Sequence, residues 1–94
     1  MNTVRMPFSF ALGQTVITRN ALETLEPADV TQALLRHSAR DWGNLDAEDW
    51  QSNDDALEHG CRLLSAYRDR HGVKFWIITE WDRSVTTVLL PEDY

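Results

Sequence analysis

The sequence predicts an α+β fold, in which two to three helices pack on one face of a three- to four-stranded antiparallel sheet. Two observations predict it. Apolar residues recur at helical spacing through the middle of the chain, and from Cys61 onward their period changes to two, as in a C-terminal β-meander. The length of 94 residues suits one domain, so residues 1–94 are expected to form a single domain. Hydrophobic residues at 43% and charged residues at 26% are near the globular average, which argues against disorder.

A short strand and one helical turn are the first predicted elements. Residues 14–18 are rich in β-branched side chains, which favour a strand. Thr18 or Asn20 then offers a side-chain oxygen of the kind that caps a helix N-terminus. A helical turn is therefore expected to follow, as far as Leu25.

The next helix is predicted for residues 27–39. Pro27 suits the first helical position, because its missing N–H costs nothing there. Acidic residues lie at the start and basic residues at the end, which complements the helix dipole. Residues spaced three and four apart predict one buried stripe, formed by Val30, Ala33, Leu34 and His37.

A second long helix is predicted for residues 47–59. Asp46 is the expected N-cap, and Asp49 stands three residues later in the capping-box position. Gly60 is expected to end the helix in a left-handed conformation. One face of this helix is expected to turn toward the sheet and carries Trp50 and Leu57.

The last third of the chain predicts the three strands of the meander, at residues 62–68, 73–81 and 85–90. His71 and Gly72 form the first predicted turn, and Pro91 ends the last strand. Apolar side chains fall on both faces of the middle strand, so this strand is expected to be central. Cys61 is expected to be a small buried residue at the start of the meander.

The net charge of −6 comes from one part of the chain. Residues 41–58 contain seven acidic residues and no Lys or Arg, which more than accounts for it. Direct nucleic-acid binding needs clustered Lys and Arg, and no such cluster stands out. The expected partner is instead basic, either a host protein or a nucleic-acid-binding complex.

Two interpretations fit this acidic segment. One is a solvated helix face. The other is an anionic docking surface that occupies a cationic site on a partner, with Trp42 either anchoring the interface or packing the loop. The candidate partner-binding residues are Asp41, Trp42, Asp46, Glu48, Asp49, Asp54, Asp55 and Glu58.

No residue pattern predicts catalysis, a metal or a cofactor. The chain has no P-loop, dinucleotide fingerprint or CxxC motif, so no cofactor is expected. Asp55 and His59 are spaced to meet on one helix face, but a metal site needs further ligands. Glu80, His37 and Ser84 are the residue types of an acid, base and nucleophile, yet no nucleophile elbow surrounds the serine. No catalytic or metal-binding residue is therefore predicted.

The composition favours the cytoplasm. A lone cysteine forms no internal disulfide, so an oxidising compartment is not indicated. The first seven residues lack the basic and apolar regions of a signal peptide. The apolar runs are far shorter than the ~18 residues of a membrane span, so no membrane association is expected.

Several segments resemble one family of small bacterial proteins. They include Asp41-Trp42-Gly43, the run from Leu63 to Tyr67, Trp76-Ile77-Ile78-Thr79-Glu80 and Asp82-Arg83-Ser84. The likeness extends over residues 13–94. Members of this family are associated with plasmids, phages and other mobile elements, and some are labelled as related to type I restriction systems. The resemblance implies a mobile-element role and assigns no functional residue.

The leading functional hypothesis is a non-enzymatic protein-binding module from a mobile genetic element. It would modulate a host defence or nucleic-acid-processing complex through the acidic surface at residues 41–58. One alternative is a small enzyme or toxin that acts on RNA. The other is a structural homodimer that pairs strand edges or apolar sheet faces.

Overall fold

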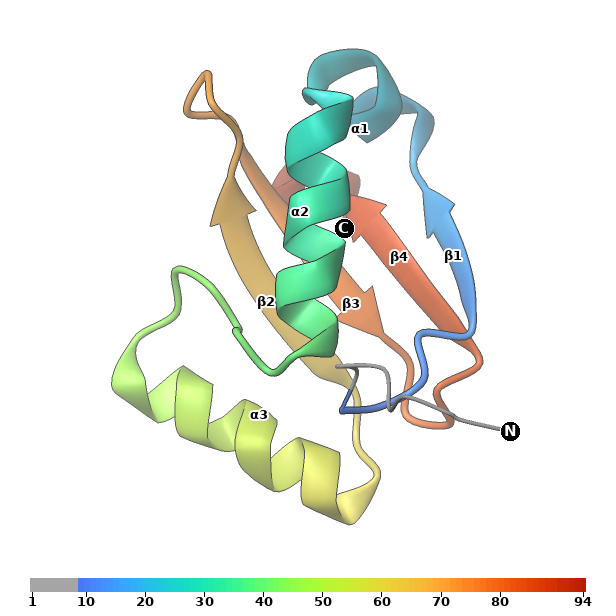
Figure 1. Cartoon of the computed structure of the whole chain (residues 1–94), viewed down its shortest axis with the longest axis vertical. Helices are drawn as coiled ribbons and strands as arrows, with labels where there is room; N and C mark the ends of the chain where they lie inside the picture. Colours follow the sequence, from blue (N-terminus) through green and yellow to red (C-terminus); the bar gives the residue numbers. More distant parts are fainter. Residues whose placement is uncertain (1–8) are drawn as a thin grey trace, which may run out of the picture.

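The computed structural model describes residues 9–94, and the expectations for the first eight residues lie outside this range. It confirms an α+β fold, with α2 crossing one face of a four-stranded sheet and α3 lying beside strand β2 (Figure 1). The elements in chain order are β1 (Gln14–Ile17), α1 (Arg19–Thr24), α2 (Pro27–Ser38), α3 (Ala47–His59), β2 (Leu63–Arg68), β3 (Lys74–Thr79), β4 (Val85–Leu89) and the 3₁₀ turn η1 (Pro91–Asp93).

The sheet is mixed, so the prediction of a purely antiparallel sheet was wrong. Its strand order is β1-β4-β3-β2, and β1 runs parallel to β4. Thr18 marks the point where the chain passes from β1 into α1. Its N–H donates to the Val88 carbonyl at 3.0 Å, and its side chain caps α1. Three helices then separate β1 from the meander. A connection of this length permits either strand direction, and the spacing of apolar residues carries no information about it.

The meander is confirmed. β2 pairs antiparallel with β3, and β3 pairs antiparallel with β4. β3 is central, as its two apolar faces predict. It is shorter than predicted and ends at Thr79, because the chain turns through the exposed Trp81 and the left-handed Arg83, with φ at 61°.

The core lies between the sheet and helices α1 and α2. Ala33 of α2 is buried against the strands, and Val30 and Leu34 pack partly buried on the same cluster, which confirms the predicted stripe. The strands, the short helix and the residues directly after α1 and β4 complete this core with Ala21, Leu25, Tyr67, Phe75, Ile77, Val88 and Leu90. Burial of this apolar area is the main favourable term in folding.

The start and end of α3 follow the sequence signals closely. The side chain of Asp46 accepts the Asp49 N–H at 2.8 Å, and Gly60 adopts the left-handed conformation with φ at 71°. Cys61, in contrast, is exposed, so its predicted burial was wrong. It lies in the connection that leaves the left-handed Gly60, and the buried residues of β2 begin only at Leu63.

The outer side of β2 is covered although this strand forms an edge of the sheet. In the loop before α3, the Trp42 carbonyl accepts the Ala66 N–H at 3.2 Å, and the Asn44 N–H donates to the Ala66 carbonyl at 2.6 Å. From α3, the Asn53 side chain accepts the Leu64 N–H at 3.0 Å and donates to the Leu64 carbonyl at 2.6 Å. The outward backbone groups of β2 at these positions are therefore paired.

Candidate functional site

The exposed acids of the predicted docking segment gather on α3 and its N-cap. We call this surface the acidic face and define it as Asp46, Glu48, Asp49, Asp55 and Glu58, all of which are exposed. Helix α3 lies beside β2, at the opposite edge of the sheet from β1 (Figure 1). No ion pair within residues 9–94 includes a carboxylate of the acidic face.

Helix α3 holds the acidic face in a fixed position on the sheet. Its inner side carries Asn53, which is buried and makes both hydrogen bonds to the backbone of Leu64. Trp50 and Leu57 are half-buried beside Asn53 on this helix. Glu48, Asp55 and Glu58 lie on the opposite side of α3 by the helical period and are therefore presented on a rigid element.

Two predicted site residues are neutralised by arginines of the α2 region. Asp41 receives two hydrogen bonds from the Arg36 guanidinium, at 2.7 and 3.3 Å. Those bonds hold the pKa of Asp41 below its usual value. Asp54 lies 3.2 Å from a guanidinium nitrogen of Arg40. Asp41 therefore joins α2 to the loop that follows it, and Asp54 joins the same loop to α3. Neither acid adds uncompensated charge to the acidic face.

Trp42 lies in the interior, not on the predicted docking surface. It is fully buried, and its indole Nε1 donates to the Asp54 carboxylate at 3.0 Å. Its ring lies 6.1 Å from the Phe10 ring and 5.4 Å from the His37 ring, measured between centroids. Two roles were considered for Trp42, and the structure shows that it packs the loop.

A buried chain of hydrogen bonds runs from α2 through three strands. The Thr86 hydroxyl donates to the Leu12 carbonyl at 2.6 Å, so its oxygen accepts from Thr79 at 2.8 Å. The Thr79 oxygen then accepts from Nε2 of His37 at 2.9 Å, and Nδ1 of His37 accepts from Ser65 at 2.5 Å. This order requires a neutral imidazole with its proton on Nε2.

Burial, together with a smaller effect from the positive charge of Arg83, lowers the pKa of His37 to about 4. The imidazole is fully buried and bonded at both nitrogens, so it has the geometry of a core residue. Ser84 belongs to a different cluster, where its hydroxyl donates to Asp82 at 2.6 Å. The structure therefore does not assemble an acid, base and nucleophile from Glu80, His37 and Ser84.

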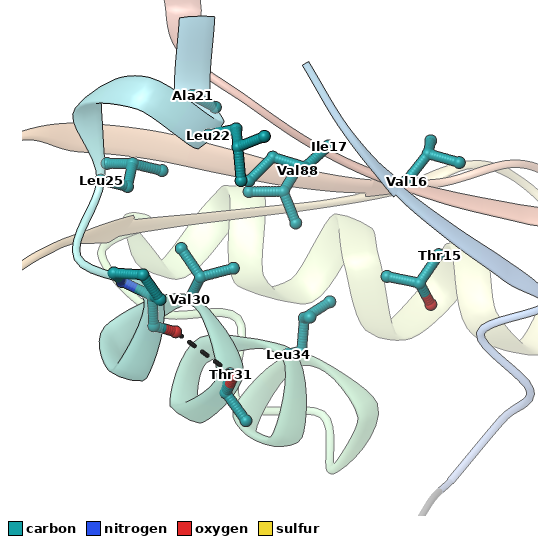
Figure 2. A pocket seen from close by; sticks show the side chains of 11 residues that line it. Thr15, Val16, Ile17, Ala21, Leu22, Leu25, Val30, Thr31, Leu34 and Val88 are labelled. Carbon is teal, nitrogen blue, oxygen red and sulfur yellow. Dashed lines mark hydrogen bonds between the residues drawn. The ribbon is translucent and has the colours of Figure 1, made fainter. Parts of the chain in front are cut away.

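A second surface feature, a pocket of about 240 Å³, lies between β1, α1 and α2 (Figure 2). Its lining is mostly apolar, and the polar side chains that reach it are Thr15 and Thr31. Thr31 donates to the Pro27 carbonyl at 3.3 Å within its own helix. The lining carries no titratable group, so the pocket suits an apolar side chain and offers no acid, base or nucleophile. The sequence did not predict this pocket, because its walls come from β1, α1, α2 and β4, and no local pattern specifies how these four elements pack.

The described part of the chain shows no metal centre: no three His, Cys, Asp or Glu side chains in residues 9–94 are grouped to hold an ion. No helix in the same range has the length and apolar character that a membrane crossing requires.

Comparison with known proteins finds no family model, curated protein or solved structure that matches this chain.

Proposed function

We propose that the protein is a non-enzymatic binding module that docks its acidic face on a basic surface of a partner protein. The observation that carries this proposal is the contrast between two sets of acids in one segment. Asp41 and Asp54 are neutralised by arginines, whereas the five carboxylates of the acidic face have no cationic partner within residues 9–94. Uncompensated charge of one sign on a rigid helix steers an oppositely charged partner into contact.

The position of these acids along α3 favours a binding role over a purely structural one. Asp46, Glu48 and Asp49 lie at the start of the helix, where negative charge stabilises it. Asp55 and Glu58 lie near its C-terminal end, where negative charge opposes the helix dipole. Asp55 also accepts a hydrogen bond from the Gln51 side-chain amide one turn earlier, at 3.1 Å, which supports the helix. Helix stability therefore does not account for Glu58, and a basic partner would.

The proposed partner is a basic host protein of a defence or nucleic-acid-processing complex. Such proteins carry cationic sites that hold phosphates, and closely spaced carboxylates present the same sign of charge to those sites. The acidic face itself repels nucleic acid, so direct nucleic-acid binding is not proposed. The resemblance to mobile-element proteins is what points to a host complex, and the charge distribution is what points to a basic surface.

The test is capture from bacterial lysate with two variants that change the net charge equally. The first neutralises the acidic face while leaving the helix cap intact, through Glu48→Gln, Asp55→Asn and Glu58→Gln. The matched control neutralises three acids elsewhere on the surface, through Glu23→Gln, Glu80→Gln and Glu92→Gln. A basic protein retained by the wild type and the control, lost with the first variant and released by salt supports the proposal.

Two outcomes would overturn it. One is a captured protein that the acidic-face variant retains as well as the wild type does. The other is the absence of any specific partner, combined with growth arrest when the protein is expressed, which favours a toxin acting on RNA. Far-UV circular dichroism of both variants checks that α3 remains folded, so that a lost partner reports charge and not unfolding.

A further inference from the structure

The outer edge of β1 is uncovered by residues 9–94. The Gln14 N–H donates to the Ser84 carbonyl at 2.9 Å, and the Thr18 N–H donates to the Val88 carbonyl at 3.0 Å. Backbone groups alternate in direction along a strand that pairs on one side. The N–H and C=O groups of the intervening odd-numbered residues, Thr15 and Ile17, therefore point away from β4. This edge differs from the β2 edge, whose outward groups are paired.

Sheet edges in soluble proteins are usually protected by charge, by proline, by a bulge or by a covering segment. The strand Gln14–Ile17 contains no charged residue and no proline. Apolar side chains are exposed beside it, because Val16 is 37% and Leu22 is 59% accessible to solvent. In Figure 2, Thr15 lies between β1 and α2, whereas Val16 lies on the opposite side of the strand. A neutral edge that residues 9–94 leave unpaired, with apolar flanks, is suited to pairing with another strand.

We propose that this edge pairs with the β1 edge of a second copy of the chain, antiparallel and about a two-fold axis. The direction of the backbone groups sets the register. The outward groups of Thr15 bond those of the partner's Ile17, and the symmetric pair forms the same bonds. Val16 then faces the partner's Val16 at the axis, as a closely spaced pair on the side of the sheet away from α2.

The charge distribution favours a second copy as the occupant. Each chain carries a net charge of −6, so two copies repel one another unless they meet where the charge is absent. β1 carries no charge, and the acidic face lies beside β2, which is the opposite edge in the order β1-β4-β3-β2. Pairing through β1 therefore joins the neutral edges and places the two acidic faces at the far ends of a continuous sheet.

This arrangement adds bivalency to the protein without depending on the proposed function. Two acidic faces at opposite ends of one dimer could engage two basic sites of an assembly, and the second contact would be favoured by effective concentration. The dimer is expected whether or not the acidic face binds a partner, so failure of either proposal leaves the other standing.

Sedimentation equilibrium of the full chain tests the dimer directly. The wild type is expected to shift with concentration from the monomer mass of 10.8 kDa toward twice that value. Val16→Lys places two ammonium groups against each other at the axis and is expected to give a monomer. Thr15→Pro removes an outward N–H without breaking the β1–β4 ladder and is expected to do the same. The matched control, Leu35→Lys, changes another exposed apolar residue, on α2, and is expected to remain dimeric.

Amide exchange on the same samples identifies the edge. The Thr15 and Ile17 amides are expected to be protected in the wild-type dimer and to lose protection on dilution, whereas the Gln14 amide stays protected by its bond to Ser84. A wild type that is monomeric up to millimolar concentration would overturn the proposal. So would a dimer that persists in both Val16→Lys and Thr15→Pro. If Val16→Lys fails to fold, Thr15→Pro decides the result.

Discussion

His37 of α2 and Thr79 of the central strand β3 share a hydrogen bond of 2.9 Å between Nε2 and Oγ1, and both side chains are fully buried. Through Ser65 of β2 and Thr86 of β4, the same network ties the helix to three neighbouring strands. A buried polar network stabilises a fold only when each member has its partner. Every buried side-chain nitrogen and oxygen in the described range does have one.

The buried imidazole predicts a loss of stability in mild acid. The pKa of His37 is about 4 in the folded chain, whereas an unfolded histidine has a pKa of about 6.5. The stability that the neutral His37 contributes is fully present when the pH is above the unfolded pKa of about 6.5. As the pH falls from 6.5 toward 4, the unfolded chain binds a proton that the folded chain excludes. The free energy of unfolding should then fall by about 1.4 kcal/mol per pH unit, or roughly 3 kcal/mol across the window.

Urea unfolding at a series of pH values between 7 and 4 measures this slope. His37→Gln cannot titrate and should flatten the profile over that window, although its stability at neutral pH will be lower. His59→Gln, which removes an exposed histidine outside the buried network, is the control for loss of a histidine side chain. An equal slope in the wild type and in His37→Gln would show that other groups cause the pH dependence.

Thr79→Val tests the hydrogen-bond chain at its centre. The substitution keeps the shape of the side chain but removes the acceptor for His37 and the donor to Thr86. Leaving a buried donor without a partner costs about 1–3 kcal/mol. The comparison variant is Thr87→Val on the opposite face of β4, where the side chain is half-buried and outside the network. Thermal or urea unfolding should show a clear loss for Thr79→Val and little change for Thr87→Val.

Asn53→Ala should uncover the β2 edge. It removes both hydrogen bonds to the Leu64 backbone, so we expect a loss of about 1–3 kcal/mol in the free energy of unfolding. The Leu64 amide should also exchange faster with solvent. Ser52→Ala, at the neighbouring exposed position, should change the stability by less than about 0.5 kcal/mol. Unchanged exchange at Leu64 in Asn53→Ala would contradict the proposed covering of this edge.

Gly43→Ala and Gly72→Ala form a matched pair that separates steric clash from backbone strain. Both glycines are left-handed, with φ at 77° and 80°. A Cβ at Gly43 would clash with the Ala66 carbonyl oxygen, whereas a Cβ at Gly72 meets nothing within 4 Å. Gly72→Ala should therefore cost about 1 kcal/mol. Gly43→Ala should cost more than about 3 kcal/mol, because the loop can no longer lie against β2. Similar losses in the two variants would contradict this packing.

Local signals in the sequence predicted the elements well. The cap at Thr18, the proline at the start of α2 and the Asp46 and Gly60 pair around α3 each act within a few residues of where they stand. The change of apolar period near Cys61 likewise predicted the meander. These features depend on backbone geometry within one element, so the sequence alone specifies them.

Features that depend on how elements meet could not be predicted. The direction of β1 is decided by the path of three helices, not by its own residues. The pairing of Asp41 with Arg36 and of Asp54 with Arg40 requires the end of α2 to lie beside the segment that follows it. This pairing removes two acids from the docking surface that the sequence predicted. Trp42 is removed from that surface as well, because its indole N–H donates to Asp54 inside the loop.

The central claim is that uncompensated carboxylates of α3 bind a basic partner, and titration of a purified captured partner tests it most directly. The dissociation constant would be measured for the wild type, for the Glu48→Gln, Asp55→Asn, Glu58→Gln variant and for the matched control, at low and high salt. We predict on the order of tenfold weaker binding for the acidic-face variant alone, with a smaller salt dependence. Equal affinity and equal salt dependence in all three proteins would contradict the claim.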